Sequence, residues 1–172
     1  GTAPNGTERN NVTIWAVNQG TWGTVDLGDS ANDNNLETVL RSIRWTPYGQ
    51  TNSVNNTYNS IVGLQVSSLT VGSVYKLQLL VGEGCCSNRG YDVNFNGSNI
   101  VDNFSTSNNT GSALFSQVIS YAFVASATSA TITLDGTNTS FGDKNPIING
   151  LTVESLATSE SNLKSMNAVT LI

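Results

Sequence analysis

Two adjacent cysteines, Cys85 and Cys86, are the residues of this sequence with the clearest chemistry. They are its only cysteines and lie in a loop, residues 82–90, that also holds three glycines. Two cysteines in a secreted type of chain are expected to pair. Adjacent Cα atoms are at most about 3.8 Å apart, below the usual disulfide range of about 4.4–6.8 Å, so a bridge requires a distorted or cis peptide. We predict a vicinal disulfide that forms a rigid bulge.

Two interpretations of this bulge are open. It offers a platform against the ring of a ligand, or it braces residues 84–90 in one shape. Pairing of the cysteines with another molecule is the remaining alternative.

Aromatic residues gather in the next candidate region. Trp45, Tyr48 and Tyr58 lie in a long polar loop, residues 45–58. Aromatic faces commonly line ligand sites, and we group these three with Arg89 of the cysteine loop as candidate ligand-binding residues. The alternative is that the aromatic rings close the edge of the fold.

An acidic stretch precedes and enters a predicted helix. Asp29, Asp33 and Glu37 lie among several asparagines, and calcium takes six to eight oxygen ligands. Calcium is therefore the one cofactor candidate, although the spacing does not match an EF-hand loop. Helix capping explains part of the same acidic pattern.

Several classes of function are disfavoured by composition. The chain has no histidine, the commonest general base, and no nucleophile elbow or phosphate-binding glycine loop. We therefore expect no enzymatic activity. A net charge of -5 argues against nucleic acid, which is bound through Lys and Arg. No apolar run approaches the roughly 18 residues of a membrane span.

The elements that position these residues are mostly short strands. Residues 74–81 are rich in Leu and Val, and residues 91–95 alternate apolar and polar side chains, as a half-buried strand does. Asn96-Gly97 predicts a tight hairpin to residues 99–104. One helix is expected near residues 35–44, where Leu36, Val39, Leu40 and Ile43 share a face.

Frequent Gly and Asn turns between short strands predict an all-β fold, an antiparallel jelly-roll β-sandwich with that one helix. We expect a single domain over residues 1–155, which opens with a polar, loop-like segment at residues 1–11. Residues 156–172 form a C-terminal arm that ends in a β-prone segment.

The segments YKLQLLVGE, RGYDVNFNG, IVDNF, SATITLDG and PIINGLTVES resemble malectin-like members of the galactose-binding-like β-sandwich superfamily, as found in large secreted bacterial proteins. The resemblance covers residues 61–155. It implies a β-sandwich module and sugar binding through loop aromatics, and it identifies no individual residue of this chain.

Two functions follow. The first is a non-catalytic extracellular or cell-surface subunit that assembles with copies of itself into filaments through terminal strands, with Ala168, Val169, Thr170, Leu171 and Ile172 as the assembly segment. Pairing of that segment with its own sheet is the alternative. The second function is a carbohydrate-binding module that uses the loop aromatics and the Cys85-Cys86 loop.

Asn-x-Ser/Thr acceptors make the chain a candidate glycoprotein. The candidates are Asn5, Asn11, Asn55, Asn108 and Asn138.

Overall fold

The computed structural model describes residues 7–9, 11–49, 60–107, 114–156 and 169–171. Within them, fourteen elements follow one another along the chain. Their bounds are β1 Thr7–Arg9, β2 Val12–Trp15, β3 Asn18–Thr21, α1 Ala31–Arg41, β4 Ser42–Trp45, β5 Ile61–Val66, β6 Val74–Glu83, β7 Gly90–Phe95, β8 Ser98–Ser105, β9 Phe115–Val124, β10 Ala130–Asp135, β11 Ile147–Ile148, β12 Gly150–Leu156 and β13 Val169–Leu171.

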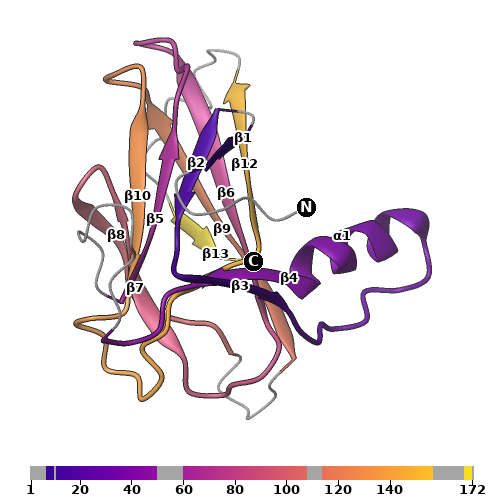
Figure 1. The fold of residues 1–172 in the computed structure, drawn as a ribbon. Helices are drawn as coiled ribbons and strands as arrows, with labels where there is room; N and C mark the ends of the chain where they lie inside the picture. Colours follow the sequence, from indigo (N-terminus) through magenta and orange to yellow (C-terminus); the bar gives the residue numbers. More distant parts are fainter. Residues whose placement is uncertain (1–6, 10, 50–59, 108–113, 157–168, 172) are drawn as a thin grey trace.

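Two antiparallel sheets form the body of the molecule (Figure 1). One has the strand order β1-β2-β5-β10-β7-β8 and the other the order β12-β6-β9-β13. A smaller sheet, β11-β4-β3, lies at one end of the two. The prediction of an all-β antiparallel sandwich with one short helix is confirmed.

The core between the two sheets follows from the alternation of side chains along each strand. In β10 every second residue is buried, in the order Ala130, Ile132 and Leu134. Leu77 and Leu79 of β6 do the same from the opposite sheet. Because a one-residue slip would turn each strand's apolar set toward water, this pattern fixes the register of the sandwich.

The hairpin between β7 and β8 turns at Asn96-Gly97, as predicted. Both residues have positive φ, 48° and 81°. The Asn96 side-chain oxygen also accepts a hydrogen bond from the Thr131 backbone N–H at 2.8 Å, which ties the turn to β10.

The helix begins and ends earlier than the sequence pattern indicated. Ser30 caps α1 at Ala31, because its hydroxyl accepts from the Asp33 N–H at 3.2 Å while Asp33 accepts from the Ser30 N–H. Residues 31–35 are Ala-Asn-Asp-Asn-Asn, with no large apolar side chain, so the spacing of apolar residues does not reveal the first turn of the helix. The helix ends at Arg41, so Ile43 is buried in strand β4 and does not belong to a helix face. Within the described part of the chain, no helix has the length and apolar character needed to cross a membrane.

Strands β1 and β12 lie near the limits expected for the domain, and those limits stay a prediction. The polar segment 1–11 contains strand β1, which pairs with β2, and β12 continues to Leu156, one residue beyond the expected domain.

The C-terminal strand pairs within its own chain. Val169, Thr170 and Leu171 lie opposite Tyr121, Ser120 and Ile119 of β9. This is the alternative to assembly that the sequence left open, and assembly through these residues stays without support. Ala168 and Ile172 lie outside the described residues.

Tyr91 of β7 connects the sandwich to the small sheet. Its ring is fully buried against Phe104, and its hydroxyl donates to the Ile147 carbonyl of β11 at 2.9 Å. Ile147 in turn pairs with Trp45 of β4. Burial raises the Tyr91 pKa well above its ordinary value of 10.0; the nearby positive charge of Arg89 acts to lower this pKa, and the negative charge of Glu83 acts to raise it.

Replacing Tyr91 with Phe removes this hydrogen bond and should lower the free energy of unfolding by about 1 kcal/mol at pH 8. Above pH 10 the unfolded phenol ionises while the folded one stays neutral, so the wild-type protein loses stability as pH rises and the variant loses less. Urea unfolding at pH 8, 10 and 11 should show the gap between them closing. A gap that stays constant or widens would contradict the assigned burial of Tyr91.

Candidate functional site

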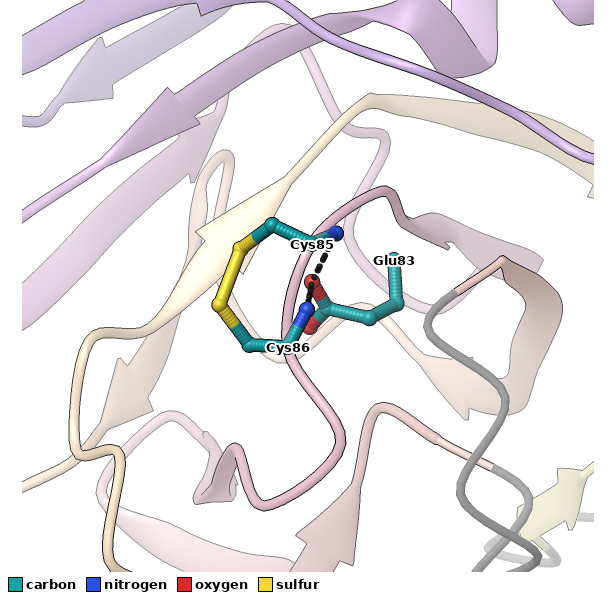
Figure 2. A group of neighbouring side chains, drawn as sticks. All are labelled: Glu83, Cys85 and Cys86. Carbon is teal, nitrogen blue, oxygen red and sulfur yellow. Dashed lines mark hydrogen bonds between the residues drawn. A yellow bond between two sulfur atoms is a disulfide. The ribbon is translucent and has the colours of Figure 1, made fainter.

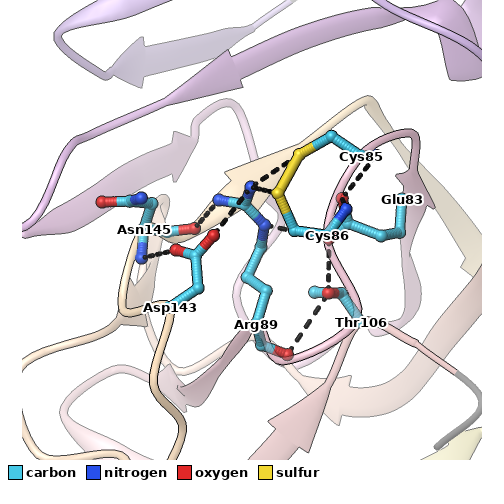
Figure 3. Close-up of a disulfide and its surroundings, with 7 residues drawn as sticks. All are labelled: Glu83, Cys85, Cys86, Arg89, Thr106, Asp143 and Asn145. Atoms are coloured by element: carbon cyan, nitrogen blue, oxygen red, sulfur yellow. Dashed lines mark hydrogen bonds and ion pairs between the residues drawn. A yellow bond between two sulfur atoms is a disulfide. The ribbon is translucent and has the colours of Figure 1, made fainter. Parts of the chain in front are cut away.

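A buried ion pair between Glu83 and Arg89 organises the loop that holds the cysteines (Figure 3). Glu83 ends strand β6 and Arg89 precedes β7. Arg89 Nε donates to Glu83 Oε2 at 2.9 Å, and the two side chains are 5% and 0% exposed. Thr106 donates its hydroxyl to the same Glu83 oxygen at 2.6 Å. Removing two charges from water is costly unless their remaining hydrogen bonds are made, and here they are.

The predicted disulfide between Cys85 and Cys86 is present. The peptide between them is not cis, and the two Cα atoms are 3.8 Å apart. Glu83 Oε1 accepts from the backbone N–H groups of Cys85 and Cys86 at 3.1 and 3.0 Å (Figure 2). Both oxygens of Glu83 therefore hold the loop, one through the cysteine backbone and the other through Arg89 and Thr106.

Arg89 distributes its remaining donors over a second loop and the disulfide. Its Nη1 donates to the Asn145 carbonyl at 2.8 Å. Its Nη2 lies 3.1 Å from Asp143 Oδ2 and 3.3 Å from the sulfur of each cysteine. Two backbone hydrogen bonds join the same two loops: the Gly90 N–H donates to the Asp143 carbonyl at 3.1 Å, and the Asp143 N–H donates to the Asn88 carbonyl at 2.8 Å. One guanidinium thus connects the end of β6, the disulfide and residues 143–145 (Figure 3).

A pocket of about 260 Å³ lies between this network and the small sheet. Strands β3, β4 and β11 form one wall, and the disulfide loop and Asn145 form the other. Its lining residues are Gly20, Thr21, Trp22, Ile43, Trp45, Cys85, Arg89, Asn145 and Ile147.

Each of the two tryptophans in the pocket packs against a glycine. A Cβ added at Gly84 would lie 2.5 Å from Trp22 Cγ and 2.5 Å from the Gly23 carbonyl oxygen, so only glycine fits there. A Cβ at Gly20 would lie 3.3 Å from the Trp45 ring. Glycine permits such close approach of the backbone, and these two positions allow both indoles to lie against it.

Trp22 is held in two further ways. Its backbone N–H donates to the Arg41 carbonyl at 3.0 Å, and the Arg89 guanidinium lies 5.7 Å from the centre of its ring, within the range of a cation–π contact. The indole Nε1 is buried and has no hydrogen-bond partner among the described residues.

Of the four predicted ligand-binding residues, two meet in this pocket. Trp45 and Arg89 line it. Tyr48 does not line it and is 61% exposed, with the Lys144 ammonium 5.6 Å from its ring. Tyr58 lies outside the described residues.

Several residues of the site were not among those predictions. They are Trp22, Glu83, Thr106, Asp143 and Asn145. The sequence carries a local signal for only one of them, since Glu83 lies within the glycine-rich cysteine loop. The others reach the site through pairings between distant segments.

The predicted calcium ligands have separate structural roles. Asp33 caps the helix. Glu37 is buried, accepts from the Leu27 N–H at 2.8 Å and lies 3.4 Å from Arg41. Asp29, Asp33 and Glu37 do not form a cluster of ligand atoms in the described part of the chain. Helix capping, the alternative stated for this pattern, accounts for Asp33, and a calcium site there stays without support.

Glu83, Cys85 and Cys86 do form a cluster, with ligand atoms within 4.8 Å of one another. The sulfurs are bonded to each other, whereas a metal requires thiolates. Both Glu83 oxygens already accept two hydrogen bonds each. The cluster is therefore a brace for the loop.

Two of the predicted glycosylation acceptors, Asn11 and Asn138, are described and exposed. Asn5, Asn55 and Asn108 lie outside the described residues. Glycosylation stays a prediction for all five.

Comparisons with known proteins support the fold and do not identify the ligand. The sequence matches no protein-family model and no curated protein. Among solved structures, the ANXUR1 extracellular domain of Arabidopsis thaliana is similar, with a TM-score of 0.61 and 13% identity over 88% of this chain. A chain from the complex of plant peptide RALF23 with FER and LLG2 has a TM-score of 0.62 and 15% identity over 84%.

A β-glucuronidase of Bacteroides uniformis is also similar, with a TM-score of 0.57 and 12% identity over 85% of this chain. This chain spans 40% of each of the two plant chains and 14% of the glucuronidase. Malectin-like ectodomains of plant receptor kinases are thus among its structural neighbours, in agreement with the resemblance seen in the sequence. At such low identity the likeness concerns the fold alone.

The Glu83→Gln substitution should be strongly destabilising. It removes the charge that compensates the buried Arg89, and breaking a buried pair in this way costs about 3–5 kcal/mol. The matched control is Glu154→Gln, which breaks the exposed pair between Glu154 and Lys76 at 2.7 Å and should cost at most about 1 kcal/mol. Equal losses in chemical unfolding would show that Glu83–Arg89 has no special structural role.

Proposed function

We propose that this chain is a non-catalytic binding module that holds a carbohydrate in the pocket between Trp22, Trp45 and the disulfide loop. The observation that carries the proposal is the composition of that pocket. Two indoles and two isoleucines line it together with a few polar groups, and ligand sites are generally apolar clefts with a small number of placed polar groups.

A sugar fits this combination because its ring has an apolar face and a rim of hydroxyl groups. Trp22 and Trp45 supply flat apolar surface, and Thr21 and Asn145 supply hydrogen-bonding groups at the same pocket. The Asn145 amide nitrogen and the Thr21 hydroxyl have no hydrogen-bond partners among the described residues. They are therefore available to a ligand.

The proposal contains no catalytic step because the acidic groups of the site are engaged. Glycoside hydrolysis uses two carboxyl groups that flank the scissile bond. Glu83 is fully buried and accepts four hydrogen bonds, and Asp143 is paired with Arg89. Neither carboxyl group lines the pocket.

Assembly through the terminal strand has weaker support than carbohydrate binding. Strand β13, which belongs to the segment predicted to pair with a neighbouring subunit, pairs with β9 of the same chain. An extracellular location is part of the proposal, supported by the disulfide and by the structural likeness to the ANXUR1 extracellular domain.

A Trp45→Ala variant should lose binding to any glycan that the wild-type protein retains on a broad array. The expected loss is at least tenfold in affinity, corresponding to about 1.4 kcal/mol, because the variant removes one of two aromatic surfaces. Isothermal titration with the best glycan measures it. Tyr48→Ala is the matched control, since Tyr48 is exposed and outside the pocket.

Thermal unfolding of both variants should first establish that they are folded. Absence of binding to every glycan on the array would overturn the proposed function. Equal losses from Trp45→Ala and Tyr48→Ala would move the site away from this pocket.

A further inference from the structure

From the way Arg89 is bonded, we infer that the ligand of the pocket is a single uncharged sugar ring and that the pocket rejects the corresponding uronic acid. This inference rests on the proposed function. An arginine in a sugar site would ordinarily suggest a carboxylate ligand, since its planar fork of five N–H groups matches a carboxylate bidentately. The hydrogen bonds that Arg89 already makes within the protein argue against a carboxylate ligand.

Neither edge of the Arg89 guanidinium has two free N–H groups. Nε donates to Glu83. Nη2, which belongs to both edges of the fork, faces Asp143 Oδ2 and the two cysteine sulfurs. Nη1 gives one hydrogen to the Asn145 carbonyl. At most one N–H of Nη1 remains, which suffices for a hydroxyl and not for a bidentate carboxylate.

The charges around Arg89 also disfavour an anion. Glu83 and Asp143 together carry one more negative charge than Arg89 neutralises, and both lie in contact with it. The Lys144 ammonium lies 5.6 Å from the centre of the Tyr48 ring, and neither residue lines the pocket. In a partly buried site like charges repel with little screening, so a ligand carboxylate meets a net negative environment.

The groups that remain for the ligand are neutral. They are the Thr21 hydroxyl, the Asn145 amide and the indole surfaces of Trp22 and Trp45. The volume of about 260 Å³ lies below the roughly 300–1,000 Å³ of pockets for drug-sized ligands, which favours one ring over an extended oligosaccharide. A terminal neutral hexose is the class that these features match.

The likeness to a β-glucuronidase carries no argument for a uronic acid ligand, because it concerns the fold at 12% identity. The residues of this chain decide the charge of the ligand.

The test compares matched pairs that differ only at the sixth carbon. Methyl glucoside is titrated against methyl glucuronide, and methyl galactoside against methyl galacturonide, by isothermal titration with the wild-type protein at neutral pH. The neutral member of a bound pair should bind at least tenfold more tightly. Asp143→Asn removes one negative charge and weakens the hold on Arg89 Nη2, so this ratio should fall in that variant.

Asp102→Asn is the control for net charge, because Asp102 is exposed on β8 and outside the pocket, and it should leave the ratio unchanged. Uronides that bind as well as or better than the neutral glycosides would overturn the inference while leaving the proposed function intact. A ratio that falls equally in both variants would show that general charge, and not Asp143, sets the preference. Absence of binding by all neutral and acidic glycans would overturn the proposed function and this inference together.

Discussion

The buried pair of Glu83 and Arg89 is the interaction on which the pocket depends. The two side chains are almost completely buried, at 5% and 0% exposure, so each charge is stabilised mainly by the protein groups around it. Glu83 meets this need with the backbone of Cys85 and Cys86 and the hydroxyl of Thr106. Arg89 meets it with Asp143, the Asn145 carbonyl and the disulfide sulfurs. The requirement for full compensation thus draws three separate segments of the chain to one point.

The same interaction defines the structural role of Arg89. Because all but one of its N–H donors are used within the protein, Arg89 mainly connects the loops, and the face of its guanidinium lies beside Trp22. The proposed binding surface then comes from the two tryptophans. Trp22 lies against Gly84, where no larger residue fits, and Trp45 lies in close contact with Gly20. The disulfide adds a rigid apolar edge at Cys85. In the proposed function, the charged groups therefore hold the structure and the neutral groups of the pocket lining contact the sugar.

The sequence predicts the framework of this protein better than its site. The Leu- and Val-rich run of β6, the alternation along β7 and the Asn96-Gly97 turn are local signals, and they predicted the sandwich and one hairpin correctly. The disulfide between the adjacent residues Cys85 and Cys86 was also predicted correctly. The predicted helix range lies later in the sequence than α1, because the first turn of α1 is polar and begins with a capping box.

Trp22 could not be assigned because its place depends on Gly84, sixty-two positions away in the chain. Asp143 and Asn145 depend on a bridge between two loops. The calcium site stays a prediction, because the acidic residues that suggested it also have structural roles: Asp33 caps the helix, and Glu37 accepts from the Leu27 N–H.

The most direct test of sugar binding between Trp22 and Trp45 is a ¹⁵N–¹H spectrum of the three tryptophan indoles during titration with a neutral methyl glycoside. The chain contains only Trp15, Trp22 and Trp45, so each indole N–H gives a separate signal. If the pocket binds the sugar, the Trp22 and Trp45 signals should move together with one dissociation constant. The Trp15 signal should stay fixed, because Trp15 lies outside the pocket. Movement of the Trp15 signal alone, or saturation of the protein with sugar while Trp22 and Trp45 stay unchanged, would contradict it.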